Sequence, residues 1–371
     1  MFHIVISDTH SPRCINKSYE YTKTIISRFP FIDTVVLNGD ILTSTSMTGS
    51  NLHKKGLSNK EKKEYLEQGA PNFFKKWKNE GKISSDMVIE YINERYNWLY
   101  SVIKNFSQLK RTIFNLGNHE SEHQLLIFGE LSLLTNSDKD DIPRVSTLAA
   151  KEIVKKFEKK LYELEKINNF HYIRNKHLII DDTLILGIPG ISHAATGPDA
   201  REQEEQTKFL INRINNLDKV SKIIIYNHTL GDYNDDTGKF NAASPSLKKF
   251  MESLPENIKT KIFVQSHNHW SYTQFMQHSD FHFVVNNAGL HNGIFNLIEF
   301  SNDVTVYDVD PHFDKVSKVK LNTNFPIHKE KEEMVARYYD DVEFILNRGD
   351  GIFTNNSNNI DSIKKSIFGK V

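Results

Sequence analysis

The chain has 371 residues, and its 47 lysines and arginines balance its 47 aspartates and glutamates. This length is enough for one large α/β domain or two ordinary ones, with a sizeable core that needs no disulfides. The neutral balance excludes net charge as a reason to expect nucleic acid or an anionic membrane as a partner. The single cysteine, Cys14, cannot form an internal disulfide, which favours a reducing, intracellular setting.

No segment of the sequence has the pattern of a targeting peptide or a membrane-spanning helix. The largely apolar residues 1–6 are followed at once by polar ones and are too few for a signal peptide. No other stretch reaches about eighteen apolar residues in a row. We therefore expect a cytoplasmic protein that does not contact a membrane, and the sequence leaves its oligomeric state open.

Short β-branched runs alternate with amphipathic stretches along the chain, which is the pattern of an α/β domain. Strands are expected at the apolar runs 4–6, 34–37, 112–116, 184–188, 222–226, 261–264, 281–285, 294–300 and 304–309. Helices are expected at the amphipathic stretches 17–29, 86–106, 121–134, 146–167, 201–217 and 244–254. Only short turns separate the last three strands, so we expect the C-terminal half to contain antiparallel strands as well and the sheet system to be mixed.

Two connections are longer than a strand–helix–strand unit requires, which is about 30 residues. Residues 44–110 and 121–170 are therefore predicted to contain helical insertions within a core domain of residues 1–310. Within the first insertion, residues 52–82 hold nine lysines against four glutamates. This segment is either a solvated helix face or a basic lid over an anionic substrate. Residues 311–371 are predicted to form a C-terminal extension with a loose Asn- and Ser-rich linker.

Polar side chains follow five of the predicted strands at the point where each strand ends. They are Asp8, His10, Asp40, Asn118, His119, His228, His267 and His269. The strand ends of an α/β sheet meet at a shared crevice, so these side chains are expected to lie close together. Their mixed oxygen and nitrogen donors suit Mn, Fe, Zn or Co better than Ca or Mg. Each residue also has a structural alternative, such as capping a turn or filling the core.

These residues, in this order, resemble the calcineurin-like metallophosphoesterase family. The family pattern is D-x-H, GD, GNH[DE], a lone His and G-H-x-H. The chain reads Asp8-Thr9-His10, Gly39-Asp40, Gly117-Asn118-His119-Glu120, His228 and Ser266-His267-Asn268-His269. The resemblance spans roughly residues 1–300 and implies a four-layer α/β/β/α sandwich of two mixed sheets, with the helical insertions added to it.

The resemblance also implies two divalent transition-metal ions, with Mn the first candidate and Fe, Zn, Co and Ni the others. The first ion would take four ligands, Asp8, His10, Asp40 and His269. The second ion would take four ligands as well, Asp40, Asn118, His228 and His267. Asp40 would therefore bridge the ions. A hydroxide between them would attack the phosphorus of the substrate, and His119 would steady the phosphate or protonate the leaving group.

The expected activity is hydrolysis of a phosphomonoester or a phosphodiester. Two alternatives remain, a nuclease that acts on DNA or RNA and a non-catalytic scaffold of the same fold. Neutral overall charge disfavours a broad nuclease, whereas the basic segment 52–82 favours a large anionic substrate. The expected partner is a phosphate ester, with a nucleotide or a nucleic acid among the candidates.

The chain departs from the family pattern in two places. Protein phosphatases of this family carry GDxxDRG, in which the second Asp orients the histidine equivalent to His119. Thr43 stands at that position here, which disfavours a protein phosphatase and leaves the orienting partner of His119 open. Ser266 replaces the glycine of G-H-x-H, and we expect this change to alter only the turn.

Four further residues lie near the motifs and are candidates for contacts with the substrate. Arg13 could hold a phosphate oxygen, and a solvated loop arginine is an equal alternative. Trp270 could stack a base or a ring, or it could pack in the core. His193 and His291 follow apolar runs and could line the rim of the pocket.

Overall fold

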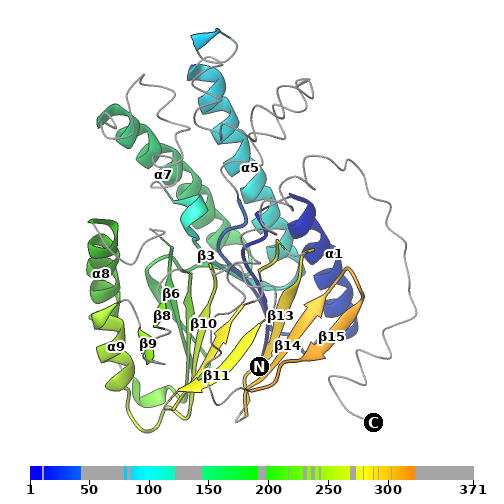
Figure 1. Ribbon diagram of the computed structural model, residues 1–371, viewed down its shortest axis with the longest axis vertical. Coiled ribbons are helices and arrows are strands. Elements are labelled where there is room, and N and C mark those ends of the chain that lie inside the picture. Colours follow the sequence, from blue (N-terminus) through cyan, green and yellow to red (C-terminus); the bar gives the residue numbers. More distant parts are fainter. Residues whose placement is uncertain are drawn as a thin grey trace.

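The computed structural model describes residues 1–10, 12–42, 79–81, 85–121, 144–190, 198–215, 217–228, 232–234, 239–241, 244–267, 273–278, 280–286, 288–290, 292–301 and 303–321. Two mixed sheets pack face to face, and helices cover their outer faces (Figure 1). The predicted four-layer α/β/β/α sandwich is therefore confirmed.

In the described chain, seven strands form the first sheet in the order β15-β14-β13-β1-β2-β3-β4. Their bounds are β1 (Phe2–Ile6), β2 (Thr34–Asn38), β3 (Arg111–Asn115), β4 (Phe170–Tyr172), β13 (Phe295–Glu299), β14 (Thr305–Asp310) and β15 (Lys315–Lys318). Strands β1 to β4 are parallel, whereas β13, β14 and β15 add to the β1 edge in antiparallel fashion. The carboxyl ends of β1, β2 and β3 consequently lie next to one another.

Six strands of the described chain form the second sheet in the order β11-β12-β10-β7-β6-β5. Their bounds are β5 (Lys176–Ile180), β6 (Thr183–Ile188), β7 (Lys222–Asn227), β10 (Thr260–Gln265), β11 (Gln274–His278) and β12 (Phe281–Val285). The inner strands are parallel and the two edge strands are antiparallel to them. A separate hairpin of β8 (Asp232–Asn234) and β9 (Lys239–Asn241) follows β7.

The alternation of side chains along each strand separates the core into layers. In β1, Ile4 and Ile6 face the helices, while Val5 between them faces the other sheet. Val36 of β2 likewise meets residues of the second sheet such as Ile224. Successive strand residues point to opposite faces, so strands buried on both sides require the unbroken apolar runs seen in the sequence.

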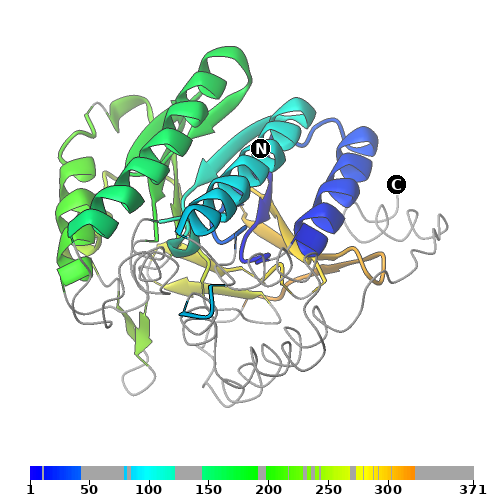
Figure 2. The ribbon, with the colours of Figure 1, turned by 90° about the horizontal axis from the view of Figure 1, so that it is seen from above.

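The helices fall into two groups, one for each sheet. Figure 2 shows α1 (Pro12–Arg28), α5 (Ser85–Leu109) and α7 (Arg144–Ile167) side by side over the first sheet. Helices α8 (Pro198–Ile211) and α9 (Pro245–Glu252) cover the second sheet. None of the described helices is long and apolar enough to cross a membrane.

Most of the predicted elements agree with the described part of the structure. Each predicted strand is present, and β13 and β14 show the expected antiparallel pairing. Helix α8 ends at Ile211, earlier than the predicted residue 217. The predicted helix at 122–134, the segment 52–78 and the linker at 354–359 lie outside the described residues. Strand β15 lies beyond residue 310 and pairs with β14.

Candidate metal centre

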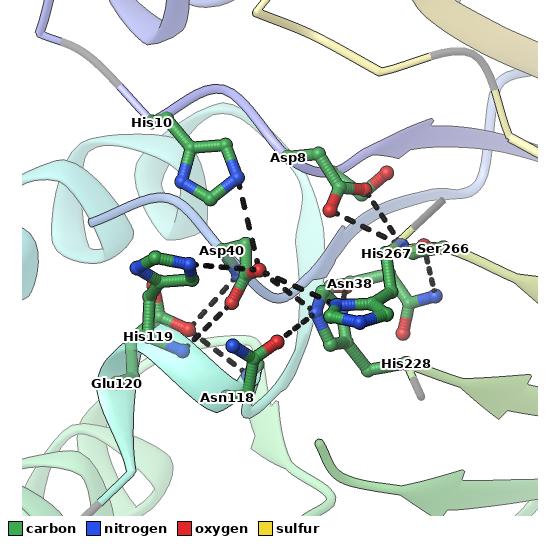
Figure 3. A network of polar contacts seen from close by, with 12 residues as sticks. Asp8, His10, Asn38, Asp40, Asn118, His119, Glu120, His228, Ser266 and His267 are labelled. Atoms are coloured by element: carbon green, nitrogen blue, oxygen red, sulfur yellow. Dashed lines mark hydrogen bonds and ion pairs between the residues drawn. The ribbon is translucent and has the colours of Figure 1, made fainter. Parts of the chain in front are cut away.

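The turns that follow β1, β2, β3, β7 and β10 bring polar side chains together at the seam between the two sheets (Figure 3). The assembled residues are Asp8, His10, Asp40, Asn118, His119, His228 and His267. The first five come from the first sheet and the last two from the second. Six of the seven predicted ligands and His119 therefore lie in one place, and His269 lies outside the described residues.

The carboxylate of Asp40 is at the centre of this group. Its Oδ2 lies within 4.0 Å of a ring nitrogen from each of four histidines. These nitrogens are His228 Nε2 at 3.0 Å, His10 Nε2 at 3.7 Å, His119 Nε2 at 3.9 Å and His267 Nδ1 at 4.0 Å. The Oδ2 atom is buried, and His228 Nε2 lies within hydrogen-bond distance of it.

Two groups of ligand atoms meet at Asp40. One consists of His10, Asp40 and His119, and the other of Asp40, His228 and His267, each with its atoms within 4.8 Å of one another. A shared, buried anionic oxygen between two sets of imidazoles fits a pair of divalent ions with nitrogen and oxygen ligands. The first group contains His119, for which the sequence predicted a contact with the substrate and no contact with an ion.

The carboxylate of Asp8 has a different set of contacts from that of Asp40. Both of its oxygens accept the backbone N–H of His267, each at 3.1 Å. This contact joins the turn after β1 to the turn after β10 and therefore crosses the seam between the sheets. Burial is the largest influence on the Asp8 side chain and raises its pKa.

Buried charge is concentrated on Asp40. Burial alone would raise its pKa, but the positive charges of His228 and His119 outweigh this and hold it well below the usual value. The same pairing acts on His228, where burial lowers the pKa and the Asp40 carboxylate raises it to about 9. An ion that binds His228 Nε2 must therefore displace a proton near neutral pH.

Backbone carbonyls fix which nitrogen two of the histidines present to Asp40. His228 Nδ1 donates to the backbone oxygen of Asn38 at 2.8 Å, and His10 Nδ1 donates to that of Leu42 at 3.1 Å. A carbonyl can only accept, so Nδ1 carries a proton in both rings. The Nε2 atoms are left to face Asp40, which is the arrangement that metal-binding histidines use.

Four of the assembled residues have strained backbones. Positive φ angles occur at Asp8 (50°), His10 (46°), Asp40 (54°) and His267 (76°). Among the described residues, eight non-glycine positions have positive φ, so half of them are in this one site. Such conformations cost roughly 1–3 kcal/mol each and cluster at functional sites. The strain is thus independent evidence that these turns have a function.

Close contact between two turns explains the glycines of the GD and GNH motifs. Gly39 has φ +83°, and a Cβ there would lie 2.5 Å from Gly117 Cα. A Cβ on Gly117 would lie 2.2 Å from both the backbone nitrogen and Oδ1 of Asp40. Only glycine permits this approach of the two backbones, which places Asp40 beside the Asn118 turn.

Glu120 holds the Asp40 turn in place, a role that sequence reasoning missed. Its Oε2 accepts the N–H groups of Asp40 and Gly117, each at 2.9 Å, and its Oε1 accepts that of Leu42 at 2.8 Å. Burial, followed by the charge of Asp40, raises its pKa to about 7. The acidic last position of GNH[DE] was the one available signal.

Most of the candidate substrate contacts lie outside the described residues. They are His193, Trp270 and His291, and Thr43 lies outside as well. Arg13 is half-buried in the first turn of α1, three residues after His10. His119 donates its backbone N–H to Asp40 Oδ1 at 2.9 Å, and its ring meets that of His10 edge-on with 4.6 Å between centroids.

No protein-family profile matches the sequence, and no protein of curated function matches it either. Among solved structures, the chain is similar to a protein described as a 5'-nucleotidase from Staphylococcus aureus in complex with alpha-ketoglutarate. The identity is 12% and the TM-score is 0.39, over 91% of this chain and 58% of that one. A 5'-nucleotidase precursor from Thermus thermophilus gives 12% identity and a TM-score of 0.36, over 94% and 60%.

A third similar structure is GAP50, described as the anchor in the inner membrane complex of Plasmodium. It gives 11% identity and a TM-score of 0.38, over 96% of this chain and 98% of that one. This chain thus spans less than two thirds of both nucleotidase structures and nearly all of the anchor protein. Likenesses this distant carry no conclusion about activity, so function must be inferred from the site itself.

Proposed function

We propose that this protein is a metal-dependent phosphoesterase that hydrolyses a phosphomonoester or a phosphodiester at a site for two ions. The observation that carries the proposal is the position of Asp40 Oδ2, buried and within 4.0 Å of nitrogens from four histidines. One carboxylate shared by two ligand groups is what a two-ion site requires. The order of the motifs along the sequence supports the same proposal.

The described ligands divide between two ions that share Asp40. Asp8 and His10 would serve the first ion, together with His269. Asn118, His228 and His267 would serve the second. When bound, a pair of divalent ions makes water more acidic and neutralises the charge of a phosphate group. Manganese is the first candidate because mixed carboxylate, amide and imidazole donors suit it.

The chain's own residues would orient these ligands and move a proton. Asn38 and Leu42 hold the imidazoles of His228 and His10 through their carbonyls, as described above. Glu120 fixes the backbone of the Asp40 turn. His119 would donate a proton to the leaving oxygen or steady the phosphate, a role suited to a positioned imidazole.

Metal analysis and a substrate panel test the proposal together. The purified full chain is assayed with Mn²⁺ and with a chelator on an aryl phosphate monoester, an aryl phosphate diester, nucleotides, DNA and RNA. We expect two ions per chain and hydrolysis of at least one ester that stops in chelator. Cleavage of only DNA or RNA would identify the nuclease alternative. A protein that binds two ions and cleaves nothing would be a scaffold, and the proposed activity would be abandoned.

A further inference from the structure

Asn38, the last residue of β2, reaches across the seam to the two turns that carry His228 and His267 (Figure 3). Its Nδ2 donates to Ser266 Oγ at 2.7 Å and to the backbone oxygen of Asn227 at 3.0 Å. Its own backbone oxygen accepts from His228 Nδ1 at 2.8 Å. One first-sheet residue therefore contacts the residue before each second-sheet histidine, and one of the two rings.

Asn115, the last residue of β3, holds the side chain of Asn38 in this orientation. Its Nδ2 donates to Asn38 Oδ1 at 3.0 Å and to the backbone oxygens of Ile188 and Tyr226 at 2.9 and 3.3 Å. With Oδ1 engaged by the first sheet, the Nδ2 of Asn38 must point to the second sheet. Both asparagines are fully buried, so water cannot replace a lost bond.

Ser266 is the position at which the sequence departs from the G-H-x-H pattern. We expected the serine to alter only the turn, but its hydroxyl accepts a hydrogen bond that crosses between the sheets. Its N–H donates to the backbone oxygen of Asn227 at 3.2 Å, and the next residue, His267, donates its N–H to Asp8. A glycine would retain these backbone contacts and would lose the contact with Asn38.

We propose that Asn38, Asn115 and Ser266, which we call the Asn38 clamp, position the ligands of the second ion. That ion would draw Asp40 and Asn118 from one sheet and His228 and His267 from the other. Its geometry therefore depends on how the two sheets are aligned at their carboxyl ends. The clamp acts through the ligands and does not touch substrate. This inference rests on the proposed function.

The first ion provides an internal reference. Its described ligands, Asp8, His10 and Asp40, all come from the first sheet, where backbone bonds join their turns directly. Asp8 N–H donates to Gly39 at 3.0 Å, and His10 N–H donates to Asp40 at 3.1 Å. Of the proposed ligands of the first ion only His269 follows a second-sheet strand, whereas the second ion takes two such ligands, His228 and His267. A change in sheet alignment should therefore affect the second ion more than the first.

Calorimetric titration of the full chain with Mn²⁺, well below its unfolding temperature, resolves the two affinities. In Asn38→Leu, the affinity for the second ion should fall about 10–100-fold, as is typical when a residue that supports metal ligands is lost. The affinity for the first ion should stay within a few-fold of wild type. Ser266→Ala should show a smaller loss, and the double variant should be no worse than Asn38→Leu because both changes break one contact.

Tyr226→Phe is the matched control. His3 Nδ1 lies 2.5 Å from Tyr226 Oη, which is also a buried contact between the sheets but is made by a ring that does not reach the metal site. This variant should lower the melting temperature of the metal-free protein and leave both Mn²⁺ affinities unchanged. Electron paramagnetic resonance should show exchange coupling between two Mn²⁺ ions in Tyr226→Phe and a loss of coupling in Asn38→Leu.

Each outcome decides the proposal. Wild-type affinities in Asn38→Leu and Ser266→Ala would overturn the clamp and leave the proposed function intact. An equal loss of the second ion in Tyr226→Phe would also overturn it, because general contact between the sheets would then suffice. If Asn38→Leu does not fold, Ser266→Ala alone decides. A wild-type protein that binds no Mn²⁺ would overturn both the clamp and the proposed function.

Discussion

The two sheets contribute unequally to the candidate metal centre. The first sheet supplies both carboxylates, Asp8 and Asp40, together with an amide and two imidazoles. The two described candidates from the second sheet, His228 and His267, are imidazoles. The carboxylates of the site are thus located on one sheet, and imidazoles approach them from the other. Loss of Asp40, the carboxylate that both ligand groups share, should therefore affect both ions, while loss of a second-sheet histidine should affect one.

The largest effect is expected from substitution of Asp40, the carboxylate that the two ligand groups share. Asp40→Asn removes the charge shared by the two ligand groups, so both ions should be lost and hydrolysis should fall to the chelator background. Elemental analysis of the purified variant measures the occupancies. Two ions retained per chain would show that Asp40 is not the shared ligand.

The next prediction compares the loss of a first-sheet histidine with the loss of a second-sheet histidine. His10→Ala should lose the first ion and His228→Ala the second, so that each variant binds one Mn²⁺ and has little activity. Calorimetric titration gives the number of ions, and the double variant should bind none. If either single variant loses both ions, the two sites form only as a pair and the division between sheets is wrong.

A smaller effect separates His119 from the ligands around it. His119→Ala should keep near wild-type metal content and lose about 10²–10⁴-fold in turnover, which is the usual contribution of a general acid. The loss should be smaller for substrates with good leaving groups, because they need less protonation. A variant that is purified without one ion would place His119 in the ligand group formed by His10 and Asp40.

The smallest effect is on the stability of the fold and comes from His3, which lies between the two sheets away from the metal centre. Burial lowers the pKa of His3 to about 3, with smaller contributions from the N-terminal charge and Arg111. Unfolded His3 binds a proton near its ordinary pKa of about 6.5, so stability is lost as pH falls below that value. At pH 5 the loss should be about 2 kcal/mol. Urea unfolding with chelator at pH 7.5 and pH 5 should show a smaller difference in His3→Gln. An unchanged difference would mean that His3 does not titrate on unfolding.

The sequence predicted the strands that carry the site because each is a buried apolar run followed by a polar turn. Six strands were not predicted, since each is the edge strand of a sheet or a short one: β4, β5, β8, β9, β11 and β15. The pattern for β5 is weak because its side chains are only partly buried. Edge strands have one neighbour and need no continuous apolar run, so periodicity alone does not identify them.

The site was predictable to the extent that it depends on residue type. Aspartate, asparagine and histidine at strand ends indicate metal binding without knowledge of the fold. The roles of Asn38 and Leu42 depend instead on where backbone carbonyls lie, which side-chain chemistry does not encode. Glu120 is visible in its motif, but its three N–H partners come from two different turns. Contacts across the seam therefore required the structure.

The pairing of β1 with β13 has a consequence for how the chain folds. Phe2 is in register with Glu299, so the strand that leads into Asp8 completes its pairing only with residues almost 300 positions later. Contacts this distant in sequence form slowly, because a long loop must close first. During synthesis β1 can pair with β2 early, yet its other edge stays open until β13 has emerged. A chain arrested before residue 295 would therefore expose the unpaired backbone edge of β1, a strand with apolar side chains, and such an edge favours aggregation.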